Sequence, residues 1–93
     1  HRDVTSKNVL VRLEPDPDAA ASHATRFRGL LSDFGIARPR EDRNGRSMSP
    51  LGPKRYRAPE VTQKDLAGCV RYSRKVDVYM FATVLFELVY RRE

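Results

Sequence analysis

The segment spanning residues 76–90 constrains the fold more than any other part of this sequence. Twelve of its fifteen residues are hydrophobic, and its only charged residues are Asp77 and Glu87. The apolar residues fall on nearly every face of a helix, which predicts a helix that begins after Ser73 as N-cap and is buried on all sides. Because a bilayer takes about 20 apolar residues to cross, this segment is predicted to be a core helix and not a membrane anchor.

Two short apolar runs near the start of the chain predict a β-hairpin. Residues 9–13 are rich in β-branched side chains, and residues 29–32 form a second short run. Residues 14–25 contain turn formers, acids and small residues without a strand or helix period, which predicts a surface insertion in the hairpin at residues 14–28.

The remaining segments predict loops and one short helix. Residues 39–54 are charged and contain two glycines and three prolines, which is typical of irregular backbone. Pro59 favours the start of a short helix, and residues 63–72 form a polar connection. A hairpin, loops and one buried helix together indicate an α+β fold.

The basic residues are unevenly distributed along the chain. The net charge is +6, and seven of the eighteen basic residues lie within residues 38–57, namely Arg38, Arg40, Arg43, Arg46, Lys54, Arg55 and Arg57. Such a cluster fits a nucleic-acid surface, or a loop whose cations bind a phosphate or an acidic side chain. The motifs on either side of the cluster favour the second interpretation, so no nucleic-acid partner is expected.

Cysteine usage bears on the compartment. Cys69 is the only cysteine, so the chain can form neither an internal disulfide nor an all-cysteine metal site. A reducing compartment is therefore expected, either the cytoplasm or the cytoplasmic side of a membrane receptor.

Four motifs with chemical potential follow one another in the order His1-Arg2-Asp3, Asn8, Asp33-Phe34-Gly35 and Ala58-Pro59-Glu60. The first two have the spacing H-R-D-x-x-x-x-N, which places a carboxylate beside an attacking hydroxyl and an amide oxygen on a magnesium ion. No single motif is persuasive, but their order and spacing are. The chain resembles a eukaryotic protein kinase domain, of the tyrosine-kinase-like or serine/threonine branch.

The resemblance implies a particular piece of that fold. Residues 1–93 would form part of the large, C-terminal lobe, from the catalytic loop through a short hairpin and an activation segment at residues 33–60 to the buried central helix. The insertion at residues 14–28 is longer than the family usually carries. The sequence contains neither a glycine-rich loop nor a strand lysine for ATP. Both ends therefore look truncated, and the small lobe is expected to be missing.

The resemblance also assigns catalytic and cofactor roles. ATP would donate its γ-phosphate to a protein hydroxyl, with Asp3 orienting that hydroxyl and accepting its proton. Asn8 and Asp33 would hold Mg²⁺ through oxygen atoms, and Leu10 would form the apolar floor under adenine or simply pack in the core. Lys7 occupies the place where tyrosine kinases carry a basic residue near the acceptor.

Further residues receive regulatory roles from the resemblance. Arg2 would bind a phosphate on the activation segment, with Ser49 as the candidate and Ser47 as its competitor. An upstream kinase would then be a partner, besides the protein substrate and ATP. Phe34 would pack against His1 in an apolar contact that breaks when the Asp-Phe-Gly turn flips.

The resemblance makes His1, Asp77 and Glu60 structural supports of the site, and a third acid, Glu87, has two interpretations. A carboxylate in an apolar helix needs hydrogen-bond donors, and for Asp77 the resemblance names the backbone of the His-Arg-Asp turn. Glu60 would pair with an arginine beyond the end of this chain. Glu87 either contacts a basic substrate or is a satisfied acid near the helix end.

The acceptor residue stays open. Thr5 and Pro53 replace the lysine and threonine typical of serine/threonine kinases, and Lys7 with Pro53 resembles tyrosine kinases. The run of residues 54–56 also resembles receptor serine/threonine kinases. The expected function is ATP-dependent protein phosphorylation by the enzyme to which this fragment belongs, with the fragment alone inactive. The alternative is a non-catalytic kinase-like scaffold.

Overall fold

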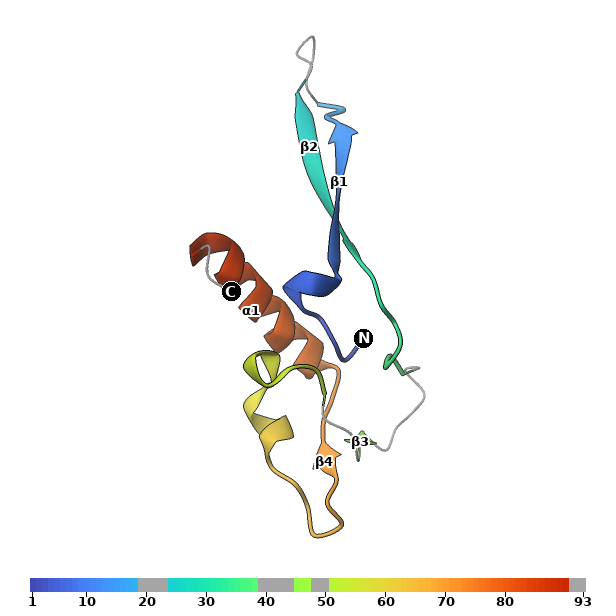
Figure 1. Cartoon of the computed structure of the whole chain (residues 1–93), viewed down its shortest axis with the longest axis vertical. Helices are drawn as coiled ribbons and strands as arrows, with labels where there is room; N and C mark the ends of the chain where they lie inside the picture. The colour runs from blue at the N-terminus through green and yellow to red at the C-terminus, as the bar shows by residue number, and fades with distance from the viewer. Residues whose placement is uncertain (19–23, 39–44, 48–50, 91–93) are drawn as a thin grey trace.

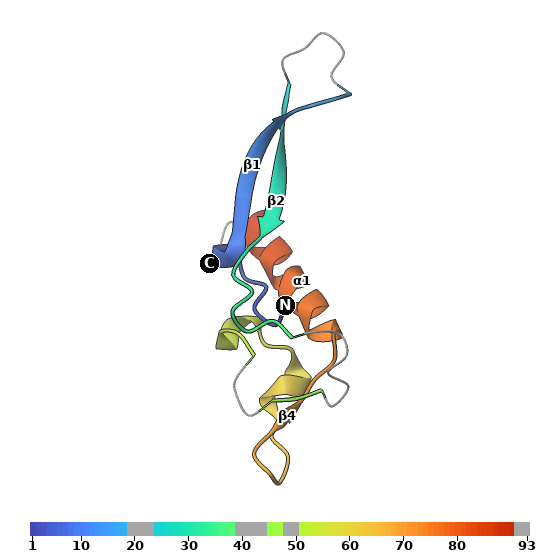
Figure 2. The same cartoon turned by 90° about the vertical axis from the view of Figure 1, so that its right-hand side faces the viewer.

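The computed structural model describes residues 1–18, 24–38, 45–47 and 51–90 and has an α+β fold (Figure 1). Its elements follow in the order η1 (Ser6–Asn8), β1 (Val9–Pro15), β2 (Thr25–Leu31), β3 (Arg46–Ser47), η2 (Lys54–Tyr56), η3 (Pro59–Thr62), β4 (Val70–Arg71) and α1 (Lys75–Tyr90). Figures 1 and 2 show the β1–β2 hairpin projecting from a body built around α1, with the N-terminal segment at its base. The molecule measures 61 × 31 × 18 Å along its principal axes.

The hairpin strands are longer than the sequence predicts. β1 and β2 pair antiparallel from Val9 opposite Leu31 to Pro15 opposite Thr25, so residues 14, 15 and 25–28 belong to the ladder. The prediction of no strand period over residues 14–25 is therefore wrong at residues 14, 15 and 25, and residues 26–28 of the predicted insertion are also strand. Opposite charges explain part of the extension, since Glu14 faces Arg26 across the ladder and also pairs with Arg12 and Arg28.

A second, very small sheet was not expected. β3 and β4 pair antiparallel, with Arg46 opposite Arg71 and Ser47 opposite Val70. The backbone N–H of Tyr72 extends this contact by donating to Gly45 O at 2.7 Å. The prediction of irregular backbone throughout residues 39–54 is wrong for residues 46–47, because pairing with a strand more than twenty positions away leaves no local sequence signal.

Helix α1 begins as predicted. The Ser73 hydroxyl accepts a hydrogen bond from the backbone N–H of Lys75 at 3.3 Å, and Ser73 O accepts one from Val76 N–H at 3.2 Å. The serine side chain thus satisfies one of the amide groups that the first turn of a helix leaves unpaired.

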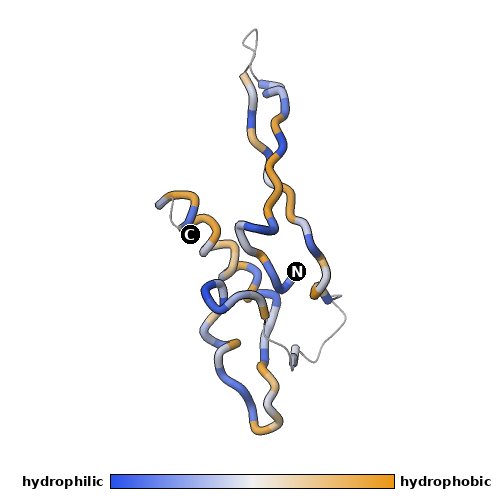
Figure 3. The backbone as a smooth tube through the Cα atoms, viewed as in Figure 1, coloured by the Kyte–Doolittle hydropathy of each residue, from blue (hydrophilic) through white to orange (hydrophobic). Residues whose placement is uncertain are grey.

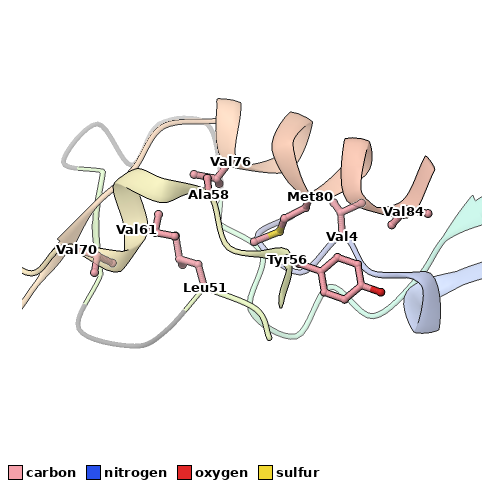
Figure 4. Packing of buried hydrophobic residues seen from close by; sticks show 9 residues of the cluster. All are labelled: Val4, Leu51, Tyr56, Ala58, Val61, Val70, Val76, Met80 and Val84. Carbon is pink, nitrogen blue, oxygen red and sulfur yellow. The ribbon is translucent and has the colours of Figure 1, made fainter. Parts of the chain in front are cut away.

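One stripe of α1 carries the core. Val76, Met80 and Val84 recur every four residues and are buried, and Met80 has no exposed surface. They pack against Val4 and against residues of the segment before α1, as the close-up in Figure 4 shows. The buried apolar cluster comprises Val4, Leu51, Tyr56, Ala58, Val61, Val70, Val76, Met80 and Val84.

The expectation that α1 is buried on all sides is wrong for the described structure. Val78, Phe81 and Leu88 are exposed by 67%, 52% and 69%. Much of the α1 tube in Figure 3 has the orange colour of hydrophobic residues. The reason is geometric, since the described residues supply a packing layer on one side of the helix alone. In the described part of the chain, no helix has both the length and the apolar character needed to cross a membrane.

Candidate active site

Asp77 fastens the start of the chain to α1. The backbone N–H of Arg2 donates to Asp77 Oδ1 at 2.7 Å, and the backbone nitrogen of His1 donates to Asp77 Oδ2 at 2.8 Å. These are the donors that the sequence predicts for a carboxylate in an apolar helix. Val4 and Thr5 follow into the core, so α1 determines where the His-Arg-Asp turn lies.

Backbone strain is concentrated in two of the predicted motifs. Among the described residues, Arg2 and Asp33 are the non-glycine residues with positive φ, at 72° and 59°. Such conformations cost about 1–3 kcal/mol each and occur most often at functional sites. Both residues therefore mark the same region as a site held in shape by its surroundings.

The Asn8 side chain connects directly to Asp3. Its Nδ2 donates to both the backbone oxygen and Oδ2 of Asp3, each at 2.9 Å. Within the described part of the chain Asn8 Oδ1 has no hydrogen-bond partner. An amide oxygen left free in this way is a ligand of the hard type that Mg²⁺ prefers.

Ser32 joins the Asp-Phe-Gly turn to the same loop. Its backbone N–H and hydroxyl donate to Asn8 O at 2.8 and 2.9 Å, while Ser32 O accepts from His1 Nε2 at 2.9 Å. The His1 ring also accepts the backbone N–H of Asp3 at its Nδ1. Since Asp33 is the next residue, these bonds bring the third predicted site residue to the loop that carries Asp3 and Asn8.

Asp33 and Asn8 fit an ion held partly by other molecules. Asp33 Oδ1 accepts the backbone N–H of Gly35 at 3.2 Å, which leaves Oδ2 without a partner among the described residues. The same residues contain no group of three or more His, Cys, Asp and Glu that could hold a metal ion. Two protein oxygens suit Mg²⁺, which usually completes its octahedron with water and substrate phosphates.

Asp3 has an unusual oxygen. Its Oδ1 is buried and has no hydrogen-bond partner within the described part of the chain, although the residue as a whole is half-buried. Unsatisfied buried polar atoms are rare in folded proteins and often have a catalytic explanation. The carboxylate as a whole is half-buried, and it is the chemical group in this loop that could take a proton from a substrate hydroxyl.

The pairing of Phe34 with His1 is present. Their ring centroids lie 4.7 Å apart at an interplanar angle of 64°, an edge-to-face arrangement that aromatic rings favour. Phe34 is nevertheless 62% exposed, and Leu10, the expected floor under adenine, is 56% exposed. The described residues thus leave the apolar side of the site open.

Arg2 is buried beside an aromatic ring that sequence reasoning missed. Its guanidinium lies 5.2 Å from the Tyr72 ring centroid and donates to the Tyr72 hydroxyl at 3.3 Å and to Ser47 Oγ at 3.4 Å. Its Nε is buried without a partner in the described structure. Ser47 is buried, while Ser49 lies outside the described residues. The contact with Tyr72 spans seventy positions, so no local signal reveals it.

Glu87 belongs to a second polar network, next to Val84 at the C-terminal end of the buried stripe of α1. The Tyr56 hydroxyl donates to Glu87 Oε2 at 2.7 Å and accepts from Ser6 Oγ at 2.9 Å, and Arg55 lies 3.3 Å from Oε1. The Tyr56 hydrogen bond is the main cause that holds the pKa of Glu87 below its ordinary value, against the opposing effect of burial. Glu87 is thus an acid paired within the chain, although its Oε1 is buried with the Arg55 ion pair and, among the described residues, no hydrogen bond.

Lys7 and Glu60, two further residues that the sequence analysis singled out, are exposed. Lys7 lies on a surface pocket of about 240 Å³ whose lining residues are Thr5, Ser6, Lys7, Pro53, Arg55, Tyr56 and Glu87. Glu60 lies on η3, and none of the described residues forms a hydrogen bond or ion pair with its side chain.

Gly52 closes the site on the side of the activation segment. Its φ is +65°, and a Cβ there would lie 3.2 Å from Asp3 Oδ1 and 3.3 Å from Met80 Cε. Gly68 has a similar φ of +78°, but a Cβ there would meet nothing within 4 Å. Substitutions at the two glycines should therefore distinguish the cost of a side chain at positive φ from the cost of steric crowding.

We expect Gly52→Ala to destabilise the fold by more than Gly68→Ala. Both changes place a β-carbon at positive φ, which costs about 1–2 kcal/mol, and Gly52→Ala adds the contact with Asp3 and Met80. The free energy of unfolding from denaturant titration measures both. Equal losses in the two variants would show that Gly52 is not tightly packed against Asp3.

This geometry defines a class of protein. The Asp3 carboxylate is hydrogen-bonded to the Asn8 amide, and Ser32, the residue before Asp33, is bonded to the same loop. The half-buried helical acid Asp77 holds that loop. Such a set belongs to enzymes that transfer phosphoryl groups to hydroxyls. The family model described as protein tyrosine and serine/threonine kinase matches residues 1–93, and the chain belongs to that family of enzymes.

Individual kinases are similar over nearly the whole chain. A probable serine/threonine-protein kinase of Dictyostelium discoideum is 37% identical over 92 residues, covering 99% of this chain and 8% of the relative. The dual specificity testis-specific protein kinase 1 of Homo sapiens is 36% identical over 95 residues, covering 98% and 13%. The chitin elicitor receptor kinase 1 of Arabidopsis thaliana is 32% identical over 89 residues, covering 96% and 12%.

The chain thus spans a small fraction of the length of these curated relatives. No solved structure matches the chain.

Proposed function

We propose that this chain is the catalytic part of the large lobe of an ATP-dependent protein kinase. The observation that carries the proposal is the double hydrogen bond from Asn8 Nδ2 to Asp3, because it places the predicted base and the predicted magnesium ligand side by side. The proposed reaction moves the γ-phosphoryl group of ATP to a protein hydroxyl.

The proposed reaction gives each residue of the site a separate role. Asp3 would accept the hydrogen bond of the substrate hydroxyl at its half-buried carboxylate and take the proton as transfer proceeds. Asn8 Oδ1 and Asp33 Oδ2 would hold Mg²⁺, which when bound neutralises charge on the phosphates. Asp77 positions the whole loop through the backbone of residues 1 and 2.

Arg2 supports a regulatory role within this function. A buried guanidinium with a partnerless Nε next to Ser47 is suited to receive a phosphate on the activation segment, placed there by an upstream kinase. Ser49 and Ser47 both remain proposed phosphorylation sites. The protein would act in the cytoplasm or on the cytoplasmic side of a membrane receptor.

The acceptor is proposed as Ser, Thr or Tyr without a choice among them. Relatives with the printed descriptions serine/threonine-protein kinase and dual specificity kinase support that range. We further propose that residues 1–93 alone transfer no phosphate, because the sequence holds no glycine-rich loop or strand lysine for ATP.

Replacing Asp33 tests the proposal. In the protein that contains this chain, Asp33→Ala should weaken Mg²⁺-dependent ATP binding by at least about 10- to 100-fold, because a metal-ligating oxygen is lost. Isothermal titration with and without Mg²⁺ measures the change. Asp18→Ala, which removes an exposed hairpin carboxylate, is the control and should bind as tightly as the parent. Equal affinity in all three proteins would contradict the assignment of Asp33 to the metal.

A further inference from the structure

The pocket beside Lys7 lies next to the proposed catalytic loop. Thr5, Ser6 and Lys7 line it from the loop that starts at Asp3, and Pro53 lines it from the residue after Gly52. Gly52 in turn borders Asp3, since a Cβ on it would lie 3.2 Å from Asp3 Oδ1. A substrate chain that presents a hydroxyl to Asp3 would therefore place its neighbouring side chains at this pocket.

The one acidic residue among those that line the pocket is already occupied. Glu87 is buried to all but 6% of its surface, accepts the Tyr56 hydroxyl at 2.7 Å and pairs with Arg55 at 3.3 Å. Tyr56 is itself buried and held by Ser6. A basic side chain of a substrate would have to displace Arg55 to reach this carboxylate.

Lys7 gives the residues that line the pocket a net positive charge. The charged residues that line it are Lys7, Arg55 and Glu87, which gives one positive charge in excess. Lys7 is exposed, and the described residues offer its ammonium group no ion pair. The side chain is thus free to approach an anionic group that enters the pocket.

We propose that this pocket selects protein substrates with an acidic side chain close to the phosphorylated hydroxyl, with Lys7 as the specificity-determining residue. The proposal rests on the proposed function for the position of the hydroxyl, but the charge preference is a property of the pocket itself. Electrostatic complementarity of this kind mainly sets partner choice. Arg55 contributes to the same preference, because its ion pair with Glu87 keeps basic substrate side chains from this carboxylate.

Peptide binding tests the preference without requiring catalysis. Fluorescently labelled peptides with a single Tyr or Ser and with Glu, Ala or Lys walked through the flanking positions are titrated with the protein that contains this chain. Fluorescence anisotropy then gives each Kd. We expect Glu at one or two positions to bind about fivefold tighter than Ala, and Lys to bind more weakly than Ala. Raising the salt concentration should shrink the difference.

Matched variants locate the effect. Lys7→Met should remove the Glu preference, whereas Lys64→Met, which deletes an exposed lysine outside the pocket lining, should keep it. Arg55→Met should shift the preference toward Lys, because it uncovers Glu87. Circular dichroism checks that each variant keeps the fold.

The possible outcomes separate the two proposals. Equal Kd values for the Glu, Ala and Lys peptides, tighter binding of Lys peptides to the unaltered protein, or the same loss in Lys64→Met as in Lys7→Met would each overturn the pocket proposal. Parallel assays of phosphate incorporation address the proposed function. A protein that prefers Glu peptides but transfers no phosphate would support the pocket and contradict the kinase activity.

Discussion

Asp3→Asn should lower phosphate transfer by the protein that contains this chain by about 10²- to 10⁴-fold, the usual contribution of a general base. The asparagine has nearly the same shape, and its side-chain oxygen is still able to accept the hydrogen bond from Asn8 Nδ2 that the structure shows at 2.9 Å. The loop should therefore keep its geometry while losing the group that takes the proton. Turnover of ATP and a peptide substrate under saturating conditions measures the effect on kcat.

Two controls accompany this variant. ATP binding should change little, because Asp3 is not one of the proposed magnesium ligands, and Asp18→Asn in the hairpin should leave kcat at the level of the parent. Turnover that stays unchanged in Asp3→Asn would remove Asp3 from its catalytic role. A parallel loss of ATP binding would instead indicate that the loop had collapsed.

Met80→Ala should lower the free energy of unfolding by about 2–5 kcal/mol, the range for deleting a large buried side chain. Met80 has no exposed surface and lies at the middle of the buried stripe of α1, next to the site where Gly52 approaches Asp3. The cavity would therefore open beneath the catalytic loop as well as within the core. Denaturant titration at constant m-value measures the loss.

Val78→Ala provides the matched control on the same helix. Val78 is 67% exposed and faces away from the buried stripe, so its replacement should change the free energy of unfolding by no more than about 0.5 kcal/mol. Equal losses in Met80→Ala and Val78→Ala would mean that the outer face of α1 is as buried as the inner one, as the sequence alone predicts.

That comparison bears on what sequence patterns are able to predict. The apolar period of residues 76–90 predicted a helix and its start at Ser73, both of which the structure has. It also predicted burial on every side, which the described structure does not have. Hydropathy reports which faces avoid water, but the number of packing layers depends on what other segments lie nearby.

The hairpin shows the same division. Two apolar runs were enough to predict two strands and their pairing, because local propensity and a short separation both favour a hairpin. The length of the ladder was underestimated, since Glu14 has low strand propensity. It is stabilised there by charge contacts with Arg26 opposite it and with Arg28 on the same partner strand.

By itself, the sequence determined the class of the site. Phosphoryl-transfer chemistry is predicted by three motifs, His1-Arg2-Asp3, Asn8 and Asp33-Phe34-Gly35. Their side chains include the carboxylates and the amide that this reaction requires. A carboxylate inside an apolar helix likewise predicted that Asp77 needs hydrogen-bond donors. The family resemblance named the backbone of the His-Arg-Asp turn, and residues 1 and 2 supply those donors.

Only the tertiary structure decided which groups are already satisfied. Tyr72 against Arg2, Tyr56 and Arg55 on Glu87, and the unpartnered oxygen of Asp3 all depend on contacts between segments far apart in the chain. Local pattern carries no information about such contacts, because each depends on where the core places two segments and not on the residues next to either one. Local sequence motifs thus predict which chemical groups the site contains, whereas the hydrogen-bond and ion-pair partners of those groups depend on tertiary packing.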